Sequence, residues 1–159
     1  MKRGTILNSV LINAIGCMGH TDLMMICDAG YPIPAGAWKV DLALTKDDPD
    51  IYKILKLIEK DLVVEKVIVA EEQEKYNPPL FGNVKDLFNY AELEKVPHTE
   101  VMTILREKVK VFVRSGSFEP WGNVILQSGV DAPQWFDKPG TIAPDFYQDR
   151  IENLNSRDE

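Results

Sequence analysis

The chain is expected to fold as a single three-layer α/β/α domain with a largely parallel central sheet. Segments with helical spacing of apolar residues alternate with short apolar segments typical of strands. One of these, Leu23–Cys27, is continuously apolar, which indicates a strand covered on both faces. The chain has 159 residues, 45% of them hydrophobic, which suffices for one domain with a buried core.

The first half of the chain predicts a helix, two strands and a second helix. Asn8 is a suitable helix N-cap and Gly19 a suitable stop, with apolar residues at helical spacing between them. The first strand follows at Leu23–Cys27, and Trp38–Leu44 alternates apolar and polar residues like a half-buried strand. Asp50 begins the second helix. Its apolar face is expected to consist of Ile51, Ile54, Leu55 and Ile58.

The second half continues the alternation. Lys66–Ala70 predicts a strand and Phe81–Leu93 a third helix. Thr99 can cap a further helix that runs through Lys108, and Val109–Val113 is the next strand. Asn123–Leu126 is expected to be the final strand. In parallel sheets ligands gather at the carboxyl ends of the strands, so polar residues at those ends are candidates for a site.

The composition changes at residue 131. Residues 1–130 form the predicted domain, and residues 131–159 contain three prolines and end in a polar, charged segment. We therefore expect 131–159 to be an extended C-terminal tail. Four aromatic residues are expected to anchor this extension to the domain or to a neighbour: Trp135, Phe136, Phe146 and Tyr147.

The charge and the cysteine content exclude several function classes. The formal net charge of −7 argues against nucleic acid and against an anionic membrane surface as partners, and it is compatible with a small neutral ligand. No apolar run reaches the length of a membrane-spanning helix, and the N-terminus does not resemble a signal peptide. Cys17 and Cys27 are expected to be free thiols, which suits a reducing cytoplasm.

A histidine and an aspartate stand at opposite ends of the first predicted strand. His20 precedes the strand and Asp28 follows it. Imidazole can give and take a proton near neutral pH, although a histidine after a helix also complements the helix dipole and an aspartate at a strand end also caps loops. A strand of this length separates its ends by more than about 20 Å. The two residues can share a site only if the flanking loops fold back or a second subunit supplies one of them.

Three further residues are candidates for a binding site. Trp121 offers a flat apolar face for stacking, or is a packing aromatic beside a turn, and Asn123 offers an amide. His98 precedes a helix, where it could equally be a surface histidine. No motif for nucleotide, phosphate or serine-hydrolase chemistry is present. A metal site from His20, Asp28 and His98 is an alternative, but the spacing is not diagnostic.

Several motifs resemble the D-ribose pyranase and L-fucose mutarotase family, and are closer to the D-ribose pyranase branch. The similarity covers residues 1–130. It rests on Gly19-His20-Thr21-Asp22, Cys27-Asp28-Ala29-Gly30-Tyr31-Pro32-Ile33-Pro34, Val113-Arg114-Ser115-Gly116 and Gly122-Asn123-Val124-Ile125-Leu126-Gln127-Ser128-Gly129-Val130.

The resemblance implies a cytoplasmic isomerase without metal or cofactor. It would interconvert the cyclic forms of a free aldose such as D-ribose, either pyranose and furanose or the anomers, by acid–base ring opening and reclosure. The family forms a ring-based decamer with sites between adjacent subunits. A non-catalytic monosaccharide-binding or transport-accessory protein is the alternative. By resemblance, His20 is the proton donor, and the sugar-binding residues are Asp28, His98, Trp121, Gly122 and Asn123, with Trp121 at a position where the family has tyrosine.

Overall fold

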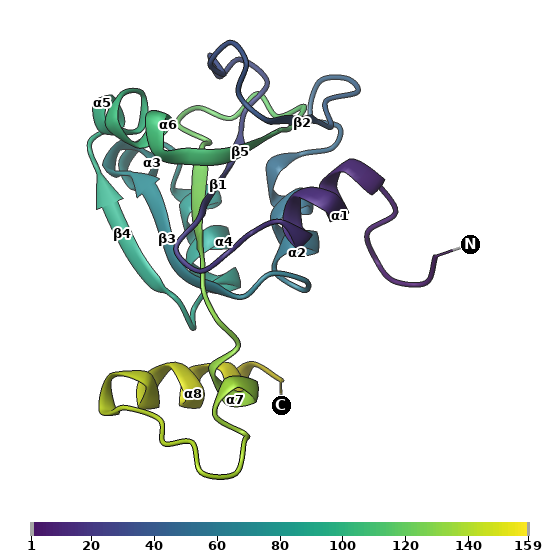
Figure 1. Ribbon diagram of the computed structural model, residues 1–159. Helices are drawn as coiled ribbons and strands as arrows, with labels where there is room; N and C mark the ends of the chain where they lie inside the picture. The colour runs from purple at the N-terminus through teal and green to yellow at the C-terminus, as the bar shows by residue number, and fades with distance from the viewer. Residues whose placement is uncertain (1, 159) are drawn as a thin grey trace.

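A six-stranded sheet forms the centre of the molecule (Figure 1). The computed structural model describes residues 2–158, and the side chains of residues 2–155. The strands are β1 (Leu23–Cys27), β2 (Lys39–Asp41), β3 (Val64–Ala70), β4 (Glu92–Val96), β5 (Val109–Arg114) and β6 (Val124–Ser128). The helices are α1 (Ser9–Gly16), α2 (Ile51–Ile58), α3 (Glu71–Tyr76), α4 (Pro78–Leu87), α5 (His98–Val101), α6 (Ile104–Lys108), α7 (Ala132–Trp135) and α8 (Asp145–Asp158).

The strand order β2-β5-β1-β6-β3-β4 confirms the predicted α/β class and shows where the sheet departs from a parallel one. The pairs β2–β5, β5–β1 and β3–β4 are parallel, whereas β6 runs antiparallel to both of its neighbours, β1 and β3. The described segment that joins β5 to β6 contains no helix, and a parallel return needs a long crossover. As a result, the first residues of β6 lie at the same sheet edge as the last residues of β1, β3 and β5.

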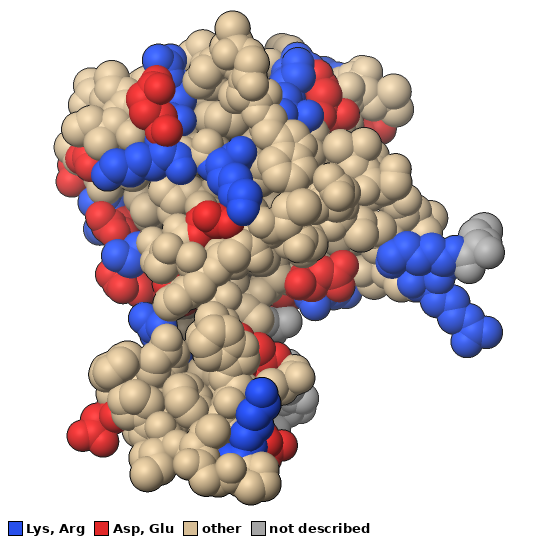
Figure 2. Space-filling view, in the orientation of Figure 1, with Lys and Arg blue, Asp and Glu red and all other residues tan. Residues whose placement is uncertain are grey.

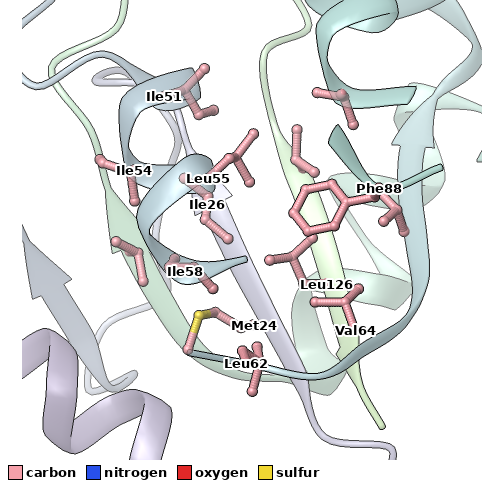
Figure 3. Close-up of a cluster of buried hydrophobic side chains, with 14 of the residues drawn as sticks. Met24, Ile26, Ile51, Ile54, Leu55, Ile58, Leu62, Val64, Phe88 and Leu126 are labelled. Atoms are coloured by element: carbon pink, nitrogen blue, oxygen red, sulfur yellow. The ribbon is translucent and has the colours of Figure 1, made fainter. Parts of the chain in front are cut away.

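Both faces of the sheet are covered, as the continuously apolar β1 predicts. Met24 and Ile26 pack in the core beneath α1, α2 and α4, where Figure 3 shows them near Leu55 and Leu126. Their neighbour Met25 points to the opposite face, where α5 and α6 cover it. These three residues of β1 are fully buried. The alternation of side chains along the strand thus divides β1 between the two cores.

The predicted helix caps are confirmed at two positions. The side chain of Asn8 accepts a hydrogen bond from the Leu11 N–H at 2.9 Å, and that of Asp50 accepts one from the Lys53 N–H at 2.7 Å. The first helix nevertheless ends at Gly16 rather than at Gly19. Gly19 instead belongs to the following turn, in which its N–H donates to the Asp22 carboxylate at 2.7 Å.

Two predicted elements between residues 38 and 93 have different bounds. The strand expected at Trp38–Leu44 is limited to β2, because the Leu44 N–H turns away from the sheet to the carbonyl of Asp48. The helix expected at Phe81–Leu93 is α4, which begins three residues earlier because Asn77 caps it and proline suits its first turn. Its predicted last turn is instead the start of β4, an edge strand in which only Val96 is buried.

The helix expected from Thr99 through Lys108 is two short helices. α5 begins at His98, one residue before the predicted cap. Thr103 has a φ of −125° and a ψ of −90°, outside the helical range, and so separates α5 from α6. The hydroxyl of Thr103 donates to the carbonyl of Thr99 at 2.6 Å, a local hydrogen bond that competes with a continuous helix.

The C-terminal extension, residues 131–158, is helical rather than extended. α7 and α8 lie below the sheet in Figure 1, at the edge away from the arrowheads of β3 and β4. Of the predicted anchors, Phe136 and Tyr147 pack against each other with ring centroids 5.3 Å apart, while Trp135 and Phe146 are exposed. The prolines and Gly140 made the whole extension look irregular in sequence. They all precede Asp145, where α8 begins, so they do not interrupt this helix.

Charged residues of both signs are interspersed over the face shown in Figure 2. Among the described residues, none of the helices is long and apolar enough to cross a bilayer.

Candidate functional site

A cavity of about 750 Å³ lies at the edge of the sheet where β1, β4 and β5 end and β6 begins. Four of the predicted site residues line it: Asp28, His98, Trp121 and Asn123. It is also lined by Ala29, Gly30, Tyr31, Pro32, Met102, Arg114, Ser117, Phe118, Glu119 and Pro120. The position agrees with the rule that ligands gather at strand ends.

Asp28 and Asn123 are held in a common hydrogen-bond arrangement. The side-chain oxygen of Asn123 accepts from the Asp28 N–H at 3.2 Å, and Oδ1 of Asp28 accepts from the Gly30 N–H at 2.8 Å. Asn123 is 4% exposed, so its orientation is tightly constrained. Since its oxygen is engaged, its amide NH₂ is the group available to donate into the cavity. This juxtaposition depends on the reversed direction of β6.

The loop that carries Trp121 is fixed by contacts from the segment around α3. The buried side chain of Gln73 donates to the carbonyl oxygen of Trp121 at 2.6 Å, and Tyr76 stacks on the indole with centroids 4.8 Å apart. Asn77 donates to Glu119 at 2.7 Å and holds the start of the same loop. Trp121 has a φ of +49°, an unusual conformation for a bulky residue. Such a conformation persists only where the surroundings enforce it, as often happens at binding sites.

Gly122 does not line the cavity but allows the loop to close. It is buried, and a Cβ at this position would lie 2.6 Å from the Cβ of Glu119 and 2.9 Å from its carbonyl oxygen. Gly122 was predicted to bind the sugar. In the structure it instead allows the backbone of the loop to pass close to Glu119.

Replacing Gly122 with alanine is expected to lower the free energy of unfolding by about 1–3 kcal/mol, because the 119–121 turn must shift. Chemical denaturation would measure this change. Gly82→Ala is the matched control: it lies inside α4, where an added Cβ would meet no atom within 4 Å, and it is expected to leave stability unchanged or raise it. Equal stabilities for the two variants would contradict the close approach.

His98 opens α5 at the rim of the cavity. Its backbone N–H donates to the Glu72 carboxylate at 2.9 Å, which fixes the start of the helix. Its Nδ1 atom is buried and has no hydrogen-bond partner among the described residues. Buried polar atoms normally have partners, so this nitrogen is a candidate for contact with a bound ligand.

The remaining polar groups near the cavity serve to hold its walls. Arg114 donates to the carbonyl of Ala29 at 3.0 Å and to Asp41 at 3.1 Å. Burial tends to raise the pKa of Asp41, but hydrogen bonds from Arg114 and from the Ala43 N–H outweigh it and lower the pKa below its usual value. Burial raises the pKa of the Cys27 thiol to about 12 and that of Tyr31 to about 12, and the Tyr31 hydroxyl donates to the carbonyl of Val101. Cys27 is therefore an uncharged thiol at neutral pH and not a nucleophile.

His20 lies at the opposite edge of the sheet, and the structure does not bring it together with Asp28. Its Nε2 atom is 3.0 Å from the carboxylate of Glu65, and it is not among the residues that line the cavity. The whole of β1 lies between His20 and Asp28, and its five residues span about 16 Å. Within one copy of the chain the loops do not fold back. The alternative of a metal held by His20, Asp28 and His98 in one copy fails on the same separation.

Sequence reasoning missed several residues on both edges. In the cavity these include Met102 and Phe118, which belong to none of the motifs, and Tyr31, which lies inside one but was not singled out as a site residue. At the other edge it missed Glu65, because nothing in the sequence pairs the start of β3 with a residue 45 positions earlier. The available signal was the position of Tyr31 within the motif that begins at Cys27, and that of Phe118 two residues after the motif that ends at Gly116.

Comparison with known proteins identifies the relatives of this chain. The model of the RbsD / FucU transport protein family matches residues 1–131. D-ribose pyranase 2 of Rubrobacter xylanophilus is 48% identical over 150 residues, which cover 94% of this chain and 97% of the relative. D-ribose pyranase 1 of Streptomyces griseus is 44% identical over 151 residues, 95% of this chain and 100% of the relative.

Among solved structures, that of Bacillus subtilis RbsD complexed with D-ribose matches with a TM-score of 0.78 and 38% identity. The match covers 98% of that chain but 82% of this one. The extension is therefore shared with the two longer relatives and lies largely outside the RbsD match. On the strength of the matched domain and these relatives, the chain belongs to the RbsD / FucU family.

Proposed function

We propose that this protein interconverts the cyclic forms of free D-ribose, pyranose and furanose, without a cofactor. The observation that carries the proposal is the cavity in which Asp28, His98, Trp121 and Asn123 converge. Carboxylate, imidazole and amide groups recognise hydroxyls, and an indole face stacks on a sugar ring. The D-ribose pyranase relatives and the ribose complex of RbsD support ribose as the first sugar to test.

The chemistry is acid–base ring opening. A base takes the proton of the anomeric hydroxyl while an acid protonates the ring oxygen, so the bond between the anomeric carbon and the ring oxygen breaks and the free aldehyde forms. After rotation, a hydroxyl gives its proton to the former acid as its oxygen adds to the carbonyl carbon, the former base returns a proton to the carbonyl oxygen, and the other ring form results. Each cycle consumes no electrons and no net proton, which is why side chains suffice.

We assign His20 as the proton donor and the cavity residues as the groups that hold the sugar. Since His20 and Asp28 lie at opposite edges of one copy, His20 must come from a neighbouring copy. The active form is then a homo-oligomer in which each edge of one chain meets the other edge of the next, such as a ring-based decamer. We place it in the cytoplasm, which suits the free thiols of Cys17 and Cys27.

The direct test is exchange NMR between the pyranose and furanose signals of ribose. Catalytic amounts of the protein are expected to accelerate this exchange above the rate in buffer, since acid–base assistance contributes about 10²–10⁴-fold. L-Fucose anomers measured in parallel show whether the specificity is for ribose. Unchanged exchange of both sugars at saturating concentration would overturn the proposal. If ribose still bound in calorimetry, a non-catalytic sugar-binding protein would be the correct interpretation.

A further inference from the structure

The carboxylate of Glu65 is the centre of a small polar cluster at the edge of the sheet opposite the cavity. Only 10% of its side chain is exposed. Its Oε1 atom accepts from the amide of Gln127 at 2.7 Å, and its Oε2 atom lies 3.0 Å from Nε2 of His20 and 3.0 Å from a guanidinium nitrogen of Arg150. Three separate parts of the chain, β6, the loop before β1, and α8, thus meet on one side chain of β3.

This arrangement determines which nitrogen of His20 carries the proton. A carboxylate is an acceptor only, so Nε2 of His20 must be the donor to Glu65. Nδ1 of His20 has no hydrogen-bond partner among the described residues. The neighbouring acid, Asp22, is engaged elsewhere: hydrogen bonds from Lys110 and from the Gly19 N–H lower its pKa. Glu65 is therefore the carboxylate that orients the imidazole.

Arg150 reaches this cluster from the C-terminal extension. It lies in α8, nineteen residues beyond the end of the family match at residue 131. Its guanidinium also lies over the ring of Tyr147, 5.0 Å from the centroid, which restrains the side chain. Because Arg150 forms an ion pair with the same carboxylate oxygen that lies beside Nε2 of His20, movement of Arg150 changes the position of the acceptor that His20 uses.

We propose that Glu65 and Arg150 are positioning residues for His20, so that the extension supplies part of the catalytic machinery. Glu65 holds Nε2–H of His20 and directs Nδ1 toward the sugar held by the adjacent copy. In the imidazolium form Nδ1 gives its proton to the ring oxygen, and in the neutral form it takes a proton back; Arg150 holds Glu65. The inference rests on the proposed function for its kinetic consequence. The hydrogen-bond arrangement itself stands independently of it.

The kinetic test compares Arg150→Ala with Arg150→Lys. Loss of the ion pair with the Glu65 carboxylate is expected to lower kcat for ribose exchange about 5-fold in Arg150→Ala. The KM should remain within about 2-fold, since the sugar cavity is untouched. Arg150→Lys should recover most of the kcat.

Lys138→Ala is the matched control. It removes the same charge from the same extension, at an exposed side chain that forms no ion pair with any described residue. An equal loss of kcat in both alanine variants, or a loss confined to KM, would overturn the role of Arg150.

A second measurement does not depend on activity. Solid-state ¹⁵N NMR of histidine-labelled protein without sugar observes the two histidines of the chain, and His98→Gln identifies the signals of His20. In the wild type, Nε2 of His20 is expected to be protonated and hydrogen-bonded. Nδ1 of the neutral ring is expected to carry no proton. Glu65→Ala and Arg150→Ala should both shift the Nε2 signal, and Lys138→Ala should not.

The two measurements separate the two proposals. If the wild type fails to accelerate exchange but the Nε2 signal responds as described, the proposed function fails and the positioning of His20 stands. If the wild type is active but the Nε2 signal of His20 is unchanged in Glu65→Ala and Arg150→Ala, the positioning role is wrong.

Discussion

Replacement of His20 with alanine is expected to lower the protein-dependent rate of ribose ring interconversion by about 10²–10⁴-fold, the contribution of a positioned acid or base. Affinity for ribose should change little, because the residues that line the cavity lie at the opposite edge of the sheet from His20. Exchange NMR measures the rate and isothermal titration calorimetry the affinity.

Two outcomes would contradict this expectation. A His20→Ala variant with the wild-type rate would remove His20 from the reaction. A variant that loses its affinity for ribose in proportion to its rate would make His20 a binding residue. A fold control is provided by His20→Gln, which retains a donor for Glu65 but cannot exchange protons at neutral pH, and which should be as inactive as the alanine variant.

Two inactive variants, His20→Ala and Asp28→Asn, are expected to restore activity when they are co-expressed. Each variant alone lacks one half of every site. In a mixed oligomer with equal amounts of both chains, about a quarter of the contacts would join an intact His20 edge to an intact Asp28 edge. The exchange rate should then reach about a quarter of the wild-type rate per chain. Asparagine retains the oxygen that accepts from the Gly30 N–H, so the turn is preserved.

The co-expression experiment decides between sites within one chain and sites between chains. If the mixed preparation is as inactive as each variant alone, His20 and Asp28 do not meet across an interface. The control is a mixture of the two variants prepared separately and combined under conditions in which the oligomers do not exchange chains, which should stay inactive.

The sequence predicted the helices and strands around β1 well and the edge elements poorly. β1 was correctly identified to the residue because a fully buried strand is continuously apolar. β4 was missed because an edge strand with four polar or half-exposed positions has no such pattern. The direction of β6 could not be read from composition, since an antiparallel and a parallel core strand are equally apolar. It follows from the connection to β5, a described loop without a helix.

The sequence identified the residues of the candidate site. It did not show which of them lie together at each edge of the sheet. Asp28, His98, Trp121 and Asn123 were identified from their chemistry and from a family resemblance, and the fold gathers all four. The distance along β1 already predicted that His20 would stand apart. Its partner Glu65 could not be predicted, because the contact joins the starts of two strands separated in the sheet by β6.

Because β6 runs antiparallel to its neighbours, its first residues lie at the cavity and its last residues lie near His20. Asn123, directly before β6, contacts the backbone of Asp28 at the sugar cavity, and Gln127, near its other end, holds the carboxylate beside His20. In the proposed assembly these two ends would belong to different active sites. Ile125 lies midway between them and is fully buried. If the proposed assembly forms, a substitution at that single core position would damage the sugar-holding half of one site and the proton-donating half of the next.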